Sequence, residues 1–183
     1  MGALIRMQTL RFFHAPDVPV PLAIPAPADF MLIRDADAFP WTGTPRPEHH
    51  DTYRARFARG HSALTGVVDG AQAFVAWIAC TALDVDEIRF RWMLSAGERC
   101  VYDVVTEAAF RGRGVYPAAL SWFARQHAAG AEPGRVWIYC DASNSASRNG
   151  IGRAGWVYAG SVRSLWVRNT MLARVGHPPA GKR

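Results

Sequence analysis

The segment from Thr106 to Ala119 reads T-E-A-A-F-R-G-R-G-V-Y-P-A-A, with two glycines and two arginines between a strand end and a helix start. Gly112 and Gly114 lack a Cβ atom, so the backbone can adopt positive φ and turn its N–H groups toward one point. The unpaired amides and the dipole of the following helix add partial positive charge, and Arg111 and Arg113 add full charges. The segment therefore predicts a turn that holds a phosphate group.

A second segment supports this interpretation. The apolar run Arg135-Val-Trp-Ile-Tyr-Cys140 is typical of a buried strand, and the pattern Asn144-x-x-Ser147-x-x-x-x-x-Arg153-x-Gly155-Trp156 follows it. Together the two segments resemble the GNAT superfamily of acetyl-CoA-dependent N-acetyltransferases. The first motif of that family, Q/R-x-x-G-x-G/A, holds the CoA pyrophosphate. The second, N-x-x-S/A-x-x-L-Y-x-K-x-G-F, follows the strand beside the pantetheine arm. The resemblance covers about residues 100–167.

The order of the predicted elements agrees with that family. We expect an α/β (α+β) fold with a mixed, mostly antiparallel sheet of six to seven strands and flanking helices. The resemblance implies that a central pair of parallel strands splays apart to admit the pantetheine. The expected strands are Phe30–Arg34, two halves of Val67–Ile78 that turn at Asp69-Gly70, Arg99–Thr106, Arg135–Cys140, Trp156–Val162 and Leu165–Met171; the expected helices are Pro47–Arg59, Pro117–Ala128 and one from Ser145.

The proline content divides the chain. Residues 15–28 contain five prolines and cannot form an interior helix. We expect a proline-rich N-terminal arm over residues 1–29, the GNAT-like acyltransferase domain over 30–175 and a flexible C-terminal tail over 176–183.

Composition indicates a small cytoplasmic enzyme. Half of the 183 residues are apolar, enough for one core, and no apolar run is long enough to span a bilayer. Twenty arginines and one lysine give a net charge of +6, but they are scattered, so neither nucleic acid nor a membrane is expected as a partner. The three cysteines are widely spaced in apolar runs and indicate buried thiols rather than disulfides or a metal site. A homodimer is left open.

The resemblance implies acetyl-CoA as the co-substrate and assigns residues to it. Backbone groups of Val104, Val105 and Thr106 would pair with the pantetheine, and Asn144 would either cap its helix or offer its amide to the pantetheine. The residues expected around the pyrophosphate are Arg111, Gly112, Arg113, Gly114, Val115 and Tyr116.

The expected reaction is direct attack of an amine on the thioester in a ternary complex. An alkyl ammonium has a pKa of about 10, so the amine must lose a proton before it attacks. Strand alternation places Glu98, Cys100, Tyr102, Val104 and Thr106 on one face and Asp103 on the other, where it would pair within the fold. The catalytic candidates are Tyr102, as an orienter or one end of a water chain, and Glu98 at the other end. Tyr102 as a sheet aromatic is the alternative.

The sequence departs from the family in both motifs. Ile151 stands where the second motif has a tyrosine, so it cannot protonate the departing thiolate, and Gly150 precedes it where a leucine is usual. Tyr116 stands where Gly or Ala is expected, and its ring must either turn away from the cofactor or cover it. The predicted function is transfer of an acyl group, with acetyl expected, to a small-molecule amine. The alternatives are a CoA-binding module without catalysis, or transfer of a longer acyl chain or to a sugar amine.

Overall fold

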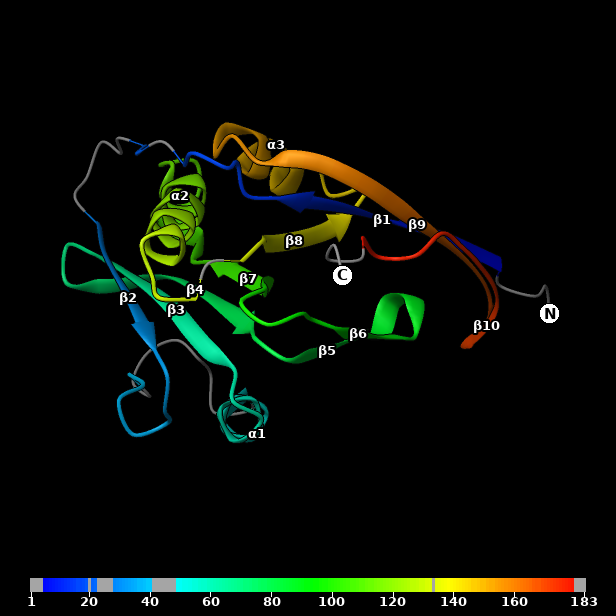
Figure 1. Cartoon of the computed structure of the whole chain (residues 1–183), viewed down its shortest axis with the longest axis horizontal. Coiled ribbons are helices and arrows are strands. Elements are labelled where there is room, and N and C mark those ends of the chain that lie inside the picture. Colours follow the sequence, from blue (N-terminus) through cyan, green and yellow to red (C-terminus); the bar gives the residue numbers. More distant parts are fainter. Residues whose placement is uncertain (1–4, 20, 23–27, 41–48, 133, 180–183) are drawn as a thin grey trace.

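The computed structural model describes residues 5–19, 21–22, 28–40, 49–132 and 134–179. In these residues, eight strands form the main sheet in the order β10-β9-β1-β8-β7-β4-β3-β2 (Figure 1). Among the strand pairs of the described residues, only β7 and β8 run parallel. The strands are β1 (Ile5–His14), β2 (Ala28–Ile33), β3 (Ser62–Val68), β4 (Ala71–Ala79), β7 (Arg99–Thr106), β8 (Val136–Asp141), β9 (Val157–Val167) and β10 (Thr170–Val175). The mixed, mostly antiparallel α/β fold is confirmed, with eight strands rather than six to seven.

The unexpected strand is β1, in the segment predicted to be an arm. It lies between β8 and β9 and pairs antiparallel with both. Leu10 and Phe12 are almost fully buried, and Phe12 packs edge-on against Trp92. The prediction that the arm spans residues 1–29 is therefore wrong for Ile5–His14, since burial of these side chains draws the segment into the sheet.

Two hairpins of the main sheet, β3–β4 and β9–β10, were predicted with different accuracy. β3 and β4 turn at Asp69 and Gly70, which both have positive φ, as the sequence indicates. β9 was expected to end at Val162 but continues to Val167, because β1 and β10 pair with it along this stretch. The turn lies at Arg168, whose φ is 54°.

Three helices and a small hairpin cover the two faces of the sheet. Helices α2 (Val115–Ala128) and α3 (Ser145–Arg153) lie on one face (Figure 1). Helix α1 (His50–Ala58) lies on the other, together with a hairpin of β5 (Ala82–Val85) and β6 (Phe90–Met93) that the sequence did not reveal. Short 3₁₀ turns, η2 (Asp86–Ile88) and η3 (Ala108–Phe110), complete the elements. Pro47 and Glu48, expected in the first turn of α1, lie outside the described residues.

Each face has its own apolar core. The core under α2 and α3 includes Leu120, Phe123 and Ile151. The core under α1 and the hairpin is aromatic and includes Tyr53 and Phe57, with Trp77 and Trp92 also buried. Trp41 lies outside the described residues. The sheet is thus packed against apolar side chains on both faces.

Candidate active site

The parallel strands β7 and β8 separate halfway along their length. Arg99–Val101 pairs with Val136–Ile138, but no pairing continues beyond Val101. The edge of residues 102–106 that faces β8 therefore has no strand partner there. The predicted splayed parallel pair is confirmed.

A β-bulge lies at the start of the splayed half of β7. Tyr102 pairs with Trp77 of β4 and Val105 pairs with Val75, so Asp103 and Val104 together oppose the single residue Ala76. Asp103 has a φ of 46°, in the left-handed region that non-glycine residues rarely adopt. The bulge inserts one residue and changes which side chains share a face.

Two predictions about the faces of β7 are wrong because of this bulge. Val104 does not share a face with Cys100 and Tyr102, since it packs against the core under α2 and α3 while they pack under α1. Asp103 does not point away from Tyr102: its carboxylate pairs with Arg56, whose guanidinium lies over the Tyr102 ring. The expectation that Asp103 pairs within the fold is confirmed.

A cavity of about 500 Å³ lies beside the splayed half of β7, between the first turns of α2 and α3. We name it the α2–α3 cavity. The structure brings together here every predicted cofactor-binding residue except Arg113, whose guanidinium lies over the ring of Phe110. The cavity is lined by Val104, Val105, Thr106, Phe110, Arg111, Gly112, Gly114, Val115, Tyr116, Pro117, Asn144, Ala146, Ser147, Asn149, Gly150 and Arg153.

The glycine turn at the mouth of this cavity has the predicted backbone. Gly112 and Gly114 have φ values of 77° and 81°, and Gly114 immediately precedes α2. A Cβ atom on Gly112 would meet no atom within 4 Å, so the turn is open on that side. Nε of Arg111 donates to the carbonyl of Thr106 at 3.0 Å and ties the turn to the end of β7. Helix-terminal amides and an arginine thus border one space, an arrangement suited to an anion.

Asn144 caps α3, which confirms one of its two predicted roles. Its Oδ1 accepts a hydrogen bond from the backbone N–H of Ser147 at 2.9 Å. The amide NH₂ does not take part in that bond, and the residue lines the α2–α3 cavity. A role toward the pantetheine stays a prediction.

Gly150 and Tyr116, which both depart from the family pattern, lie against each other between α3 and α2. The Tyr116 ring lies against Gly150, where a Cβ atom would come within 2.4 Å of Cδ1 of that ring. The Tyr116 hydroxyl contacts Oγ of Ser147 at 3.2 Å and so joins α2 to α3. Ile151 is fully buried in the core. Gly150 thus makes room for Tyr116, whose side chain forms part of the cavity wall.

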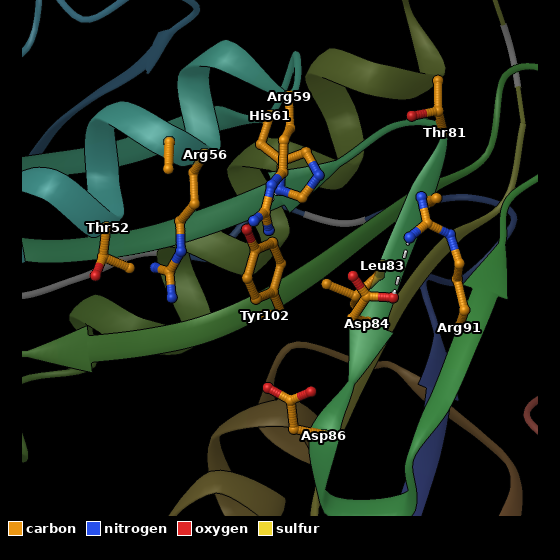
Figure 2. Close-up of a pocket in the computed structure, with 12 residues that line it drawn as sticks. Thr52, Arg56, Arg59, His61, Thr81, Leu83, Asp84, Asp86, Arg91 and Tyr102 are labelled. Atoms are coloured by element: carbon orange, nitrogen blue, oxygen red, sulfur yellow. Dashed lines mark hydrogen bonds and ion pairs between the residues drawn. The ribbon is translucent and has the colours of Figure 1, made fainter.

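A second cavity, of about 660 Å³, lies on the opposite face of the sheet between α1 and the β5–β6 hairpin. We name it the α1–β5 cavity. Figure 2 shows Tyr102 between Arg56 of α1 and the ion pair of Asp84 and Arg91 on the hairpin. It is lined by Thr52, Ala55, Arg56, Arg59, His61, Thr81, Ala82, Leu83, Asp84, Asp86, Arg91 and Tyr102.

Tyr102 forms a hydrogen bond with His61, a residue that the sequence did not single out. The Tyr102 hydroxyl lies 2.5 Å from Nδ1 of His61, and both side chains are buried. Burial raises the pKa of Tyr102 above its ordinary range, partly offset by Arg56. Burial also lowers the pKa of His61, so the imidazole is neutral at neutral pH. His61 precedes β3 and is distant in sequence from Tyr102, so only the paired sheet brings the two together.

Glu98, the other predicted catalytic residue, lines neither cavity. Its carboxylate is buried and accepts hydrogen bonds from Nε1 of Trp137 at 3.0 Å and from the backbone N–H of Ser95 at 2.8 Å. These contacts hold the loop before β7 against the core. A catalytic role for Glu98 stays a prediction without support from this arrangement.

Cys100 is fully buried on β7, close to Tyr102. Burial, and to a smaller extent the charge of Glu98, raises the pKa of its thiol. A thiol in such surroundings is a poor nucleophile because the thiolate is disfavoured. Over the described ranges, no group of three or more His, Cys, Asp and Glu side chains is arranged to hold a metal ion. Nor does any helix in the described part of the chain have the length and apolarity to span a membrane.

Comparisons with known proteins agree on the fold. No protein-family model and no curated protein match this chain. Among solved structures, it is similar to an acetyltransferase from the GNAT family of Colwellia psychrerythraea, with a TM-score of 0.53 and 16% identity over 88% of this chain and 56% of that one. It is also similar to a GCN5-related N-acetyltransferase from Sphaerobacter thermophilus, with a TM-score of 0.51 and 16% identity over 97% and 56% of the two chains. A third, from Kribbella flavida, has a TM-score of 0.50 and 18% identity over 91% and 60%.

The chain therefore has the GNAT fold, as its two motifs predicted. It spans between 52% and 65% of the length of similar solved structures.

Proposed function

We propose that this protein transfers an acyl group, with acetyl expected, from acyl-CoA to the amine of a small-molecule acceptor. The observation that carries the proposal is the position of the two cavities along β7. Tyr102 lines the α1–β5 cavity, Val104 to Thr106 line the α2–α3 cavity, and only the bulge residue Asp103 lies between. The two cavities therefore flank neighbouring residues of β7, in the half of the strand that does not pair with β8.

The α2–α3 cavity has the features that CoA requires. The amides at the start of α2 and the guanidinium of Arg111 suit a pyrophosphate, because helix N-termini and arginines both bind phosphate oxygens. The edge of β7 without a strand partner suits the pantetheine amides, which can hydrogen-bond to a strand as a further strand does. The residues that would hold CoA are those predicted for it, with the exception of Arg113.

The α1–β5 cavity is the proposed acceptor site. Its size is in the range of small-molecule pockets, and its lining combines arginines and aspartates with Tyr102. In the reaction, the amine nitrogen forms a bond with the thioester carbonyl carbon and the carbon–sulfur bond breaks. Negative charge develops on the carbonyl oxygen, and a backbone N–H group in the half of β7 that has no partner in β8 would stabilise it.

We expect direct transfer, without an acyl-enzyme intermediate, because of the surroundings of the Cys100 thiol on β7. Cys100 is fully buried with a raised pKa, so it is a poor nucleophile. The leaving thiolate, from a thiol with a pKa of about 8.5, can depart without a dedicated proton donor.

A second candidate function is CoA binding without catalysis. It is favoured by Ile151, which is fully buried at the position where the family motif has a tyrosine. The test is thiol release from acetyl-CoA and from longer acyl-CoA thioesters, measured against a panel of amines that includes sugar amines. Amine-dependent thiol release is expected. CoA binding without thiol release for any pair would favour the second candidate, and no CoA binding would contradict both.

A further inference from the structure

We propose that His61, acting through Tyr102, accepts the proton that the acceptor amine loses. This inference rests on the proposed acyl transfer and adds a residue that neither motif contains. His61 does not contact the amine in this scheme. It is a positioning and relay residue behind Tyr102, which contacts the acceptor.

The geometry supports such a relay. The Tyr102 hydroxyl and Nδ1 of His61 are 2.5 Å apart, and both residues line the α1–β5 cavity. Their rings meet nearly at right angles, with centroids 5.5 Å apart, so the imidazole lies at the hydroxyl end of the tyrosine. The backbone N–H of His61 donates to the carbonyl of Arg56 at 3.0 Å, which anchors the histidine to the end of α1.

The relay requires one tautomer of His61. The backbone of Ala82 raises the pKa of the imidazole, against the larger effect of burial, and so favours a proton on the ring. In the tautomer that carries its proton on Nε2, Nδ1 accepts from the Tyr102 hydroxyl. A proton moving from the amine to Tyr102 can therefore displace the hydroxyl proton onto Nδ1.

Charged groups from each neighbouring element act on this pair. Arg56 in α1 and Arg59 just after it disfavour a proton on His61, whereas Asp84 of β5 favours it. Arg56 is itself neutralised by the carboxylate of Asp103 on β7. Together with burial, these charges keep His61 unprotonated and able to accept a proton at neutral pH.

The step balances without any further reactant. The bound ammonium loses one proton to the Tyr102 oxygen, and the hydroxyl proton passes to Nδ1 of His61. The neutral amine nitrogen then bonds to the carbonyl carbon, the carbon–sulfur bond breaks, and a second proton of that nitrogen passes to the departing thiolate. The proton on His61 then passes to water, which restores the neutral pair.

The alternative is that His61 only packs against Tyr102, and the pH dependence of kcat/KM separates the two. If the relay operates, the bound ammonium is the reactant, and the proton that it loses is on His61 in the transition state. For wild type, kcat/KM should be level from about pH 6.5 up to the amine pKa of about 10 and fall below the pKa of His61. Without the relay, only the neutral amine reacts, and kcat/KM rises about tenfold per pH unit over the same range.

The experiment measures thiol release from acetyl-CoA with a competent amine for wild type, His61→Gln, Tyr102→Phe and the double variant. At pH 7, each single variant should lose about 10²- to 10⁴-fold in kcat/KM, with the sloping profile and unchanged CoA affinity. The loss of kcat/KM in the double variant should be no larger than in either single variant, because either substitution alone already disables the relay.

His127→Gln is the matched control. The pKa of His127 is also lowered by burial, but its imidazole bonds to the carbonyl of Gly134, far from Tyr102 in the fold.

Each outcome decides the proposal. A level profile retained in folded His61→Gln, or losses that multiply in the double variant, would overturn the relay. If His61→Gln does not fold, a level pH profile of kcat/KM in Tyr102→Phe would likewise overturn the relay. A wild-type protein that releases no thiol with any amine contradicts the proposed function, whereas an active wild type with unaltered variants contradicts the relay alone.

Discussion

The glycine turn allows a test that separates ligand binding from backbone strain. Gly112 has a φ of 77°, and a Cβ atom there would meet no atom within 4 Å. Gly70, in the β3–β4 hairpin, has a φ of 74° and equally open surroundings. Gly112→Ala and Gly70→Ala therefore introduce the same strain at two places, and only the first lines the α2–α3 cavity.

The expected magnitudes follow from this geometry. A side chain in the left-handed region costs about 1–2 kcal/mol, so both variants should unfold roughly 2 to 8 °C below wild type. In Gly112→Ala, the methyl group would also occupy the space through which a phosphate approaches the turn amides. Loss of two charge-assisted hydrogen bonds, each contributing about 1.5–3 kcal/mol, weakens CoA binding by about 10²- to 10⁴-fold.

Isothermal titration calorimetry with CoA and thermal denaturation measure the two effects on the same samples. We expect equal losses of stability and a loss of CoA affinity in Gly112→Ala alone. The reasoning is refuted if folded Gly112→Ala binds CoA as wild type does, or if Gly70→Ala loses affinity to the same extent.

Three further predictions concern stability and the chemistry of β7. Gly150→Ala should destabilise the protein by about 1–3 kcal/mol, because its Cβ would come within 2.4 Å of the Tyr116 ring; Tyr116→Ala in the same chain should remove most of that loss in a denaturant double-mutant cycle, and fully additive losses would contradict the contact. Cys100→Ala should lower stability by about 1 kcal/mol with kcat within about twofold of wild type. An acetyl adduct on Cys100 in intact-protein mass spectrometry after mixing with acetyl-CoA would argue against direct transfer. Glu98→Gln should lower stability by about 1–3 kcal/mol, because Trp137 or Ser95 loses its charged acceptor; a folded variant with a strongly reduced kcat would restore Glu98 as a catalytic candidate.

Local chemistry made the motif region predictable. The bounds of β7, the positive φ values of Gly112 and Gly114 and the capping of α3 by Asn144 each depend on a few neighbouring residues. The β3–β4 turn at Asp69-Gly70 is of the same kind. For this reason, all the residues predicted for the cofactor except Arg113 lie around one cavity.

Features that depend on distant pairing were not predictable. β1 precedes a proline-rich stretch and carries no turn signal that places it between β8 and β9. The bulge at Asp103 puts a non-glycine residue at positive φ, which no local pattern announces, and it reversed the face expected for Val104. His61 became a candidate only when its contact with Tyr102 was seen.

The central claim is that the α2–α3 cavity binds CoA, and amide chemical shifts recorded during a CoA titration of ¹⁵N-labelled protein test it most directly. We expect saturable shifts at Gly112, Gly114 and Val115, along the splayed half of β7 and at the start of α3. Amides around the α1–β5 cavity should shift mainly when an amine acceptor is added as well. Absence of any saturable shift with CoA, or shifts confined to residues away from the α2–α3 cavity, would contradict it.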